Sequence, residues 1–117
     1  MKRKVYSCPV ELTVEVMGGK WKSRILWHLN NKSYRYGELR KLIPEITQKV
    51  LTQALREMEE DGLVKRTIYE GAIQHVEYSL TDYGHSLSPV LQVMSQWGSM
   101  HILRERELRK KEEKTVD

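Results

Sequence analysis

Two neighbouring stretches in the middle of the chain carry hydrophobic residues at helical spacing. The first begins at Tyr36 and places Leu39, Leu42 and Ile43 on one side of a short helix. Pro44 follows at once, and a proline disfavours the α conformation in the residue before it. The pattern therefore predicts a short amphipathic helix that ends just before Pro44.

The second stretch predicts a longer helix whose two ends are both marked by the sequence. Thr47 stands at the N-cap position, where its hydroxyl can accept a hydrogen bond from a free backbone N–H. Gly62 provides the left-handed conformation that commonly follows the end of a helix. Apolar residues recur between them at helical spacing, namely Val50, Leu51, Ala54, Leu55 and Met58. Two helices joined by a tight turn are typical of a helix-turn-helix, whose second helix enters a DNA major groove.

The opposite face of this second helix is polar. It carries Gln48, Lys49, Thr52, Gln53 and Arg56. Gln and Arg can form bidentate hydrogen bonds with purine edges, and Thr offers a hydroxyl and a methyl group. Any solvated helix face is polar as well, so base reading and simple solvation are equal alternatives on this observation alone.

The next part of the chain alternates as two strands around a short turn. Residues 63–69 and 74–80 predict a β-hairpin with its turn at 70–73. A hairpin directly after a recognition helix is a wing, whose tip approaches the minor groove or the sugar–phosphate backbone. The alternative is a hairpin that only covers the edge of the helical core. The basic residues that we expect to contact phosphates are Arg35, Arg40, Lys41, Lys65 and Arg66.

Apolar residues also dominate the helices predicted near both ends of the chain. The first spans about residues 9–17, is followed by Gly18-Gly19, and precedes a second helix at 20–29. After the N-cap residue Thr81, a helix to about residue 109 is kinked or split by Pro89, and the charged residues beyond Leu108 are expected to fray.

The long apolar stripe of the C-terminal helix, together with the apolar first helix, indicates a homodimer interface. Packing within a single chain is the alternative. The residues expected in this interface are Val10, Val14, Leu91, Met94 and Trp97.

Charge is distributed unevenly along these 117 residues, a length that suits one domain. Residues 1–56 contain twelve Lys or Arg against four acidic residues, a balance of +8. Residues 57–103 contain two against seven, a balance of −5, and residues 104–117 contain six against five. Basic charge therefore gathers on the half with the reading helix, which favours a polyanionic partner.

Several classes of protein are disfavoured by what the sequence lacks. It has no run of eighteen apolar residues and no secretory signal, and its single cysteine fits a reducing cytoplasm, so we expect a cytoplasmic protein without a membrane partner. The four histidines show no metal-ligand spacing, and Trp21 stands where a phosphate-binding loop would need Ser or Thr after Lys20. We therefore expect no catalytic residues, no metal site, no cofactor and no enzyme activity.

The chain resembles the HxlR-type winged helix-turn-helix regulators, which are relatives of the MarR group. The matching pieces run in order from residue 8 to residue 98. They are Cys8-Pro9-Val10, Gly19-Lys20-Trp21, Ile25-Leu26, Tyr34-Arg35-Tyr36, Glu38-Leu39, Leu51-Thr52, Leu55-Arg56, Asp61-Gly62-Leu63-Val64, Arg66, Val76-Glu77-Tyr78-Ser79-Leu80-Thr81, Gly84 and Trp97-Gly98. One departure lies in the wing, where the family usually has Pro-Pro and a basic residue and this chain has Ile73, Gln74 and His75.

The resemblance implies an α+β winged helix-turn-helix fold in which N-terminal and C-terminal helices form a dimer interface. It implies a single domain over residues 1–109, with the helix-turn-helix at 36–62, the wing at 63–80, dimerisation helices at 81–109 and a charged tail at 110–117. It also implies a homodimeric transcription regulator, expected to act as a repressor, that binds a pseudo-palindromic operator in double-stranded DNA. The alternatives are a winged-helix protein-interaction module without specific DNA binding and, more weakly, an RNA-binding variant.

Cys8 is a candidate redox sensor. It precedes Pro9 at the start of the first helix, close in sequence to Lys2, Arg3 and Lys4, and both the helix dipole and nearby cations favour a thiolate. In the family, an N-terminal cysteine at this place serves some members as a sensor of small electrophiles or oxidants. The alternative is a small capping or packing residue.

Overall fold

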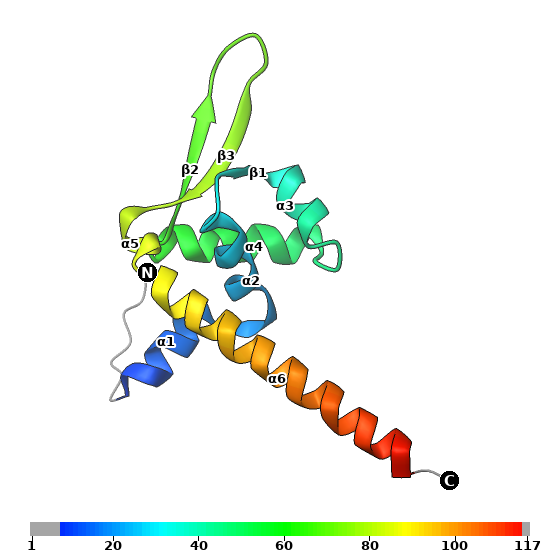
Figure 1. The fold of residues 1–117 in the computed structure, drawn as a ribbon. Coiled ribbons are helices and arrows are strands. Elements are labelled where there is room, and N and C mark those ends of the chain that lie inside the picture. Colours follow the sequence, from blue (N-terminus) through cyan, green and yellow to red (C-terminus); the bar gives the residue numbers. More distant parts are fainter. Residues whose placement is uncertain (1–7, 116–117) are drawn as a thin grey trace. The chain divides into compact units, whose positions relative to one another are not determined.

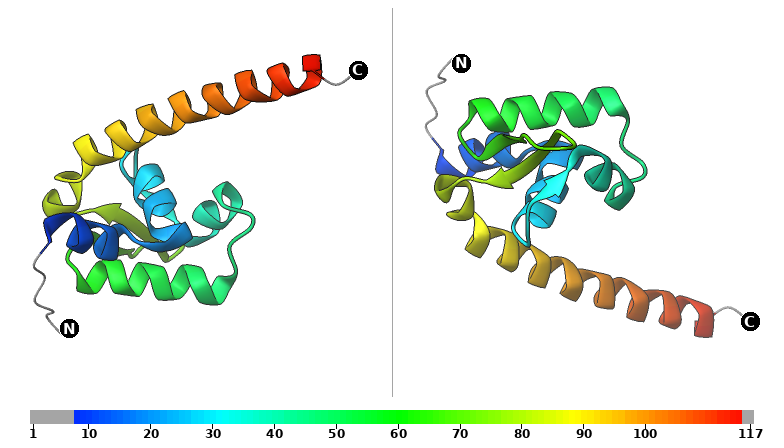
Figure 2. Two further views of the ribbon diagram at one scale, coloured as in Figure 1. Left: turned by 90° about the horizontal axis from the view of Figure 1, so that it is seen from below. Right: turned by 90° about the horizontal axis from the view of Figure 1, so that it is seen from above.

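A computed structural model describes residues 8–115 of the chain. The chain divides after Ser86 into two compact units. The first contains the helices α1 (Pro9–Met17), α2 (Gly19–Leu29), α3 (Tyr36–Leu42), α4 (Gln48–Glu60) and α5 (Asp82–His85), and the strands β1 (Tyr34–Arg35), β2 (Val64–Tyr69) and β3 (His75–Leu80). The second consists of the long helix α6 (Ser88–Thr115). Figures 1 and 2 show these elements along the chain.

The sheet of the first unit is antiparallel, with strand order β1-β3-β2. In the hairpin, Val64 lies opposite Leu80 at the base and Tyr69 lies opposite His75 at the far end. The hairpin projects away from the helices as a separate arm (Figure 1). This confirms the predicted pair of strands. The short strand β1, which pairs Tyr34 with Tyr78, was not predicted because two residues form no recognisable alternation.

The predicted signals at both ends of α4 are confirmed. The Thr47 side chain accepts a hydrogen bond from the backbone N–H of Val50 at 3.2 Å. At the other end Gly62 has a φ of 77°, its N–H donates to the Glu59 carbonyl, and the Leu63 N–H donates to the Met58 carbonyl. This pair of bonds is a Schellman motif, which directs the chain from α4 straight into β2.

The core of the first unit is built from the apolar faces of α2, α3 and α4. Its fully buried side chains are Ile25, Leu26, Leu29, Leu39, Ile43, Leu51, Leu55, Met58 and Leu63. Two predicted members of these faces are instead exposed: Leu42 retains 39% of its surface and Val50 retains 38%. Both residues stand at the edge of the apolar face of their helix, where the spacing of residues along the sequence predicts burial least well.

The C-terminal part of the chain shows one predicted and one unpredicted feature. The helix is split as Pro89 suggested, since α5 ends at His85 and Pro89 occupies the first turn of α6, where a missing N–H costs nothing. The expected fraying beyond Leu108 is wrong, because α6 continues to Thr115. Glu105 and Glu107 precede Arg109 and Lys111 by four residues, a spacing that supports a helix even in a highly charged segment.

Candidate nucleic-acid interface

The polar face of α4 forms an open surface on the first unit. Gln48, Lys49, Gln53 and Arg56 are exposed, and Thr52 is half-buried. The helix is held on its other side, where Leu51, Ala54, Leu55 and Met58 are buried. All five residues predicted for this face are therefore presented outward from one rigidly packed helix.

Tyr36 anchors the first turns of α4 from the start of α3. Its hydroxyl donates a hydrogen bond to the backbone carbonyl of Gln48 at 3.0 Å and lies 3.1 Å from the Thr52 hydroxyl oxygen. No pattern in the sequence identifies this tyrosine as part of the site, because its partners lie 12 and 16 residues further along the chain. The contact restrains the Thr52 side chain on the polar face of α4.

A second anchor lies on the opposite flank of α4. The Gln53 side-chain amide donates to Glu57 Oε1 at 3.1 Å, and Lys22 Nζ of α2 lies 2.6 Å from Glu57 Oε2. The ammonium of Lys22, and then the amide of Gln53, lower the pKa of the Glu57 carboxyl. Sequence patterns place Glu57 only in an acidic run, and they give no sign that Lys22 belongs to the site.

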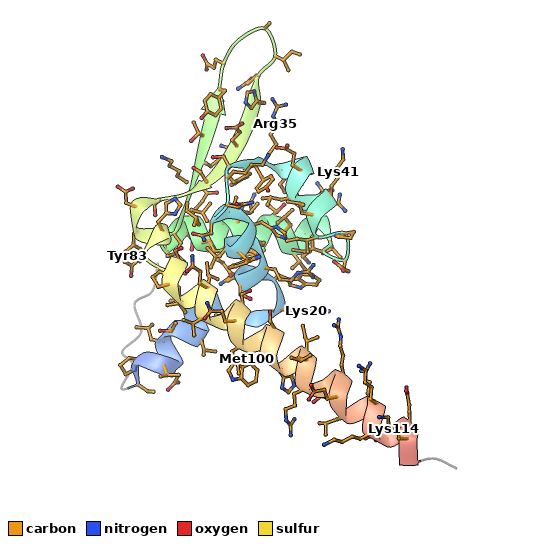
Figure 3. The ribbon with its side chains drawn as sticks, viewed as in Figure 1. Lys20, Arg35, Lys41, Tyr83, Met100 and Lys114 are labelled. Carbon is orange, nitrogen blue, oxygen red and sulfur yellow. The ribbon has the colours of Figure 1, made fainter. Side chains whose placement is uncertain are left out.

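The five residues predicted to contact phosphates are all exposed, and they come from the elements that precede and follow α4 in the chain. Arg35 and Lys41 project outward near the two ends of α3 (Figure 3). The Arg35 backbone N–H donates to Glu38 Oε1 at 2.8 Å, which fixes the start of α3. Arg24 of α2 reaches Glu45 in the turn between α3 and α4 at 3.4 Å. The turn of the helix-turn-helix is thus tied to the helix behind it.

The wing carries its two basic residues near its base. Lys65 and Arg66 lie opposite Ser79 and Tyr78, whereas the turn at residues 70–74 contains no Lys or Arg. At the far end the rings of Tyr69 and His75 stack with centroids 5.0 Å apart, and Ile73 retains 80% of its surface. Any phosphate contact from a Lys or Arg of the wing strands must therefore come from near the base.

The residues predicted for a dimer interface differ in their exposure. Four are open in the single chain: Val10 (71%) and Val14 (64%) on α1, and Met94 (47%) and Trp97 (64%) on α6. Leu91 is buried, with only 3% of its surface exposed, so it has little area to offer a partner. The same α6 carries further exposed apolar side chains at Val93, Met100 and Leu103.

Cys8 is an exposed free thiol at the N-cap position of α1. Its side chain makes no capping hydrogen bond, although its carbonyl accepts the first helical bond from the Leu12 N–H at 3.1 Å. The capping alternative for its side chain is therefore not realised. The basic residues Lys2, Arg3 and Lys4, expected near it, lie outside the described residues.

Among residues 8–115, no three His, Cys, Asp or Glu side chains are grouped so that they could hold a metal ion. Within the same range no helix is long and apolar enough to cross a bilayer. The polar face of α4 and its surroundings are the surface that the geometry singles out.

Comparison with known proteins identifies the same architecture. The profile of the HxlR-like helix-turn-helix family matches residues 16–106. The helix-turn-helix-type transcriptional regulator YtcD of Bacillus subtilis is 49% identical over 89% of this chain and 82% of its own length. The redox regulator HypR in its oxidised form is 45% identical, with a TM-score of 0.76 over 80% of this chain and 96% of that one. Diamide-treated YodB from B. subtilis is 32% identical, with a TM-score of 0.68 over 80% of this chain and 93% of that one.

Proposed function

The chain belongs to the HxlR-like helix-turn-helix family, and on this premise we propose that it is a transcriptional repressor that binds a pseudo-palindromic DNA operator as a homodimer. The observation that carries the proposal is the polar face of α4, whose five residues are presented outward while the other side of the helix is buried. A helix presented in this way can enter a major groove and bring several donors and acceptors to the base edges at once. As a regulator of bacterial or archaeal genes, the protein would act in the cytoplasm.

The two classes of contact have different roles in this proposal. Gln48, Lys49, Thr52, Gln53 and Arg56 read bases, while Arg35, Arg40, Lys41, Lys65 and Arg66 neutralise phosphates. Base contacts supply discrimination between sequences, whereas phosphate contacts position the protein and make its affinity depend on salt. The exposure of nine of these residues, with Thr52 half-buried, supports their contact with DNA.

The homodimer would place two copies of α4 in successive major grooves, about 34–36 Å apart. The exposed apolar residues of α1 (Val10 and Val14) and of α6 (Met94 and Trp97) support this assembly, because large uncovered apolar surfaces usually mark an interface. Two-fold symmetry of the protein then requires two-fold symmetry of the operator.

The test compares a base-reading variant with a phosphate-contacting variant on the same DNA. An operator is first selected from a random library, and its affinity is measured across a salt series against random competitor. Gln53→Ala is expected to cost about 1–3 kcal/mol on the operator and to change base preference at one position. Lys41→Ala is expected to weaken binding to all sequences alike and to reduce the salt slope by about one.

Two results would contradict the proposal. One is equal loss on operator and random DNA for Gln53→Ala, which would remove that residue from the reading surface. The other is wild-type binding that random competitor abolishes as readily as operator, which would favour a protein-interaction module of the same fold.

We further propose that small electrophiles or oxidants act at Cys8 and release the DNA. HypR is a redox regulator and YodB has been treated with the thiol oxidant diamide, and Cys8 is an exposed, uncommitted thiol. Treating the operator complex with diamide or a quinone is expected to dissociate the wild type and to leave Cys8→Ser bound. Equal sensitivity of both proteins would rule out Cys8 as the target.

A further inference from the structure

The Glu57 carboxylate joins two side chains that come from different helices. Its Oε2 lies 2.6 Å from Lys22 Nζ of α2, and its Oε1 accepts a hydrogen bond of 3.1 Å from Gln53 Nε2. We refer to Lys22, Glu57 and Gln53 as the carboxylate bridge. Each carboxylate oxygen thus has its own partner, and the end of the bridge is a residue of the α4 reading face.

The bridge decides which way round the Gln53 amide is held. A carboxylate can only accept hydrogen bonds, so Gln53 must turn its nitrogen, and not its oxygen, toward Glu57. One N–H is used in that bond, which leaves the second N–H and the carbonyl oxygen free. One donor beside one acceptor is the pair that matches N7 and N6 of adenine in the major groove.

Lys22 distinguishes this arrangement from an ordinary surface pair. A Gln–Glu contact four residues apart on one helix is weak by itself, because both side chains can rotate. The Lys22 side chain retains only 17% of its surface and projects from α2, which packs against α4. Its position therefore restricts Glu57, and through Glu57 it restricts Gln53. It also favours the ionised carboxylate, consistent with the lowered pKa of Glu57.

We infer that Lys22 and Glu57 are positioning residues that hold the Gln53 amide in the orientation that selects adenine over guanine. The inference rests on the proposed function, in which Gln53 reads a base. A flipped Gln53 would turn its NH2 group outward, and two donors suit the two acceptors of guanine, O6 and N7. Holding the amide before binding also lowers the entropy that must be lost in the complex.

The experiment measures base discrimination for single-site variants on the selected operator and on derivatives with each base pair replaced. Gln53→Ala first identifies the base pair that Gln53 reads. Glu57→Gln then keeps the shape of residue 57 but can offer either an oxygen or a nitrogen to Gln53, and Lys22→Met keeps the apolar stem without the charge. Both are expected to reduce discrimination for adenine against guanine by roughly tenfold at that base pair, while discrimination at the other positions stays unchanged.

Two controls separate positioning from a general structural role. Lys22→Arg retains the cation and is expected to restore most of the discrimination. Gln48 is also on the reading face but its side chain lies outside the bridge, so the base pair affected by Gln48→Ala is expected to be insensitive to Lys22→Met. Denaturant midpoints of all variants show that each protein is folded before its binding is compared.

A second measurement does not depend on DNA. In NMR spectra of the free protein, the two side-chain amide protons of Gln53 are expected to have widely separated shifts, because only one is bonded to a carboxylate. The separation is expected to shrink toward that of an unbonded glutamine side chain in Glu57→Gln, and to a smaller extent in Lys22→Met. Shifts that are the same in all three proteins would overturn the bridge itself.

The outcomes distinguish the inference from the function on which it rests. If Gln53→Ala changes one base pair and the Lys22 and Glu57 variants leave that pair unaffected, the positioning role is overturned while the base-reading role stands. If Lys22→Met weakens operator and random DNA equally, Lys22 is a phosphate contact or a purely structural residue, and the inference is again overturned. If the wild type selects no sequence, the proposed function fails and the adenine assignment fails with it.

Discussion

Tyr36 and Thr52 show how one partly buried contact can change the hydrogen-bonding groups that a side chain presents at the surface. A tyrosine hydroxyl has a single proton, and Tyr36 donates it to the Gln48 carbonyl. The Thr52 hydroxyl, 3.1 Å away, must then donate its own proton to the Tyr36 oxygen. Under the proposed function, Thr52 is left with a hydrogen-bond acceptor and a methyl group for DNA, which suit the amino groups of adenine or cytosine and the methyl group of thymine.

Replacing this tyrosine is therefore expected to affect both stability and specificity. Tyr36→Phe removes the bond to the α4 backbone and frees the Thr52 proton, so we expect a loss of about 1 kcal/mol in the free energy of unfolding. We also expect weaker discrimination at the base pair that Thr52→Val identifies. Urea denaturation and binding to operator derivatives measure the two effects.

The control for this substitution is Tyr83→Phe, because Tyr83 retains 67% of its surface and lies on α5, away from α4's first turns (Figure 3). It is expected to change neither quantity. An unchanged denaturation midpoint for Tyr36→Phe would show that the hydroxyl contributes nothing to holding α4.

At the level of elements, the passage from α4 into the wing depends on how closely α5 approaches it. The Thr81 backbone N–H donates to the Leu63 carbonyl at 3.0 Å, and the Thr81 hydroxyl accepts from the Gly84 N–H at 2.9 Å. A Cβ atom added at Gly84 would lie 2.1 Å from the Leu63 carbonyl oxygen and 3.0 Å from the Leu63 carbonyl carbon. Both obstructing atoms belong to the backbone, which cannot rotate away as a side chain can.

Gly84→Ala is therefore expected to destabilise the first unit by about 1–3 kcal/mol, as overpacking of a tight contact generally does. The free energy of unfolding from urea titration measures this loss. Gly37→Ala is the matched control, because a Cβ atom at Gly37, within α3, meets no atom within 4 Å and alanine favours a helix. Equal stability of the two variants would mean that α5 moves aside without cost.

At the level of the whole molecule, the exposed apolar residues of α6 are the expected interface of the homodimer that the proposed function requires. Trp97 retains 64% of its surface, and its ring stacks on His101 with centroids 5.1 Å apart. Met100 and Leu103 nearby retain 69% and 57%. A large aromatic side chain among exposed apolar neighbours is typical of the residues that dominate binding energy in an interface.

Trp97→Lys is expected to weaken the proposed homodimer by roughly 30-fold or more in its dissociation constant, because a charge would be buried where an aromatic ring packs. Sedimentation equilibrium measures this constant. Ile73→Lys is the control, since Ile73 is equally apolar and 80% exposed but lies at the wing turn. A dimer that is unaffected by Trp97→Lys would place the interface elsewhere.

Much of this protein follows from local patterns in its sequence. The spacing of apolar residues predicted α3, α4 and the two wing strands, because side chains repeat on one face of a helix or strand at a fixed period. Thr47 and Gly62 marked the ends of α4, because the unpaired backbone groups at the ends of a helix need partners nearby in the chain. The polar residues of α4 could be predicted as outward-facing for the same reason. Cys8 stands out because it is the only cysteine.

The tertiary structure decided which side chains meet across elements. Lys22 reaches Glu57 from 35 positions away, and Tyr36 reaches Thr52 from another helix. Such pairs depend on the angle and register at which helices pack, and no periodicity within one element encodes these. The same holds for the exposure of Leu42. The sequence thus determined α4 and its outward polar face, whereas packing determined how the groups on that face are oriented.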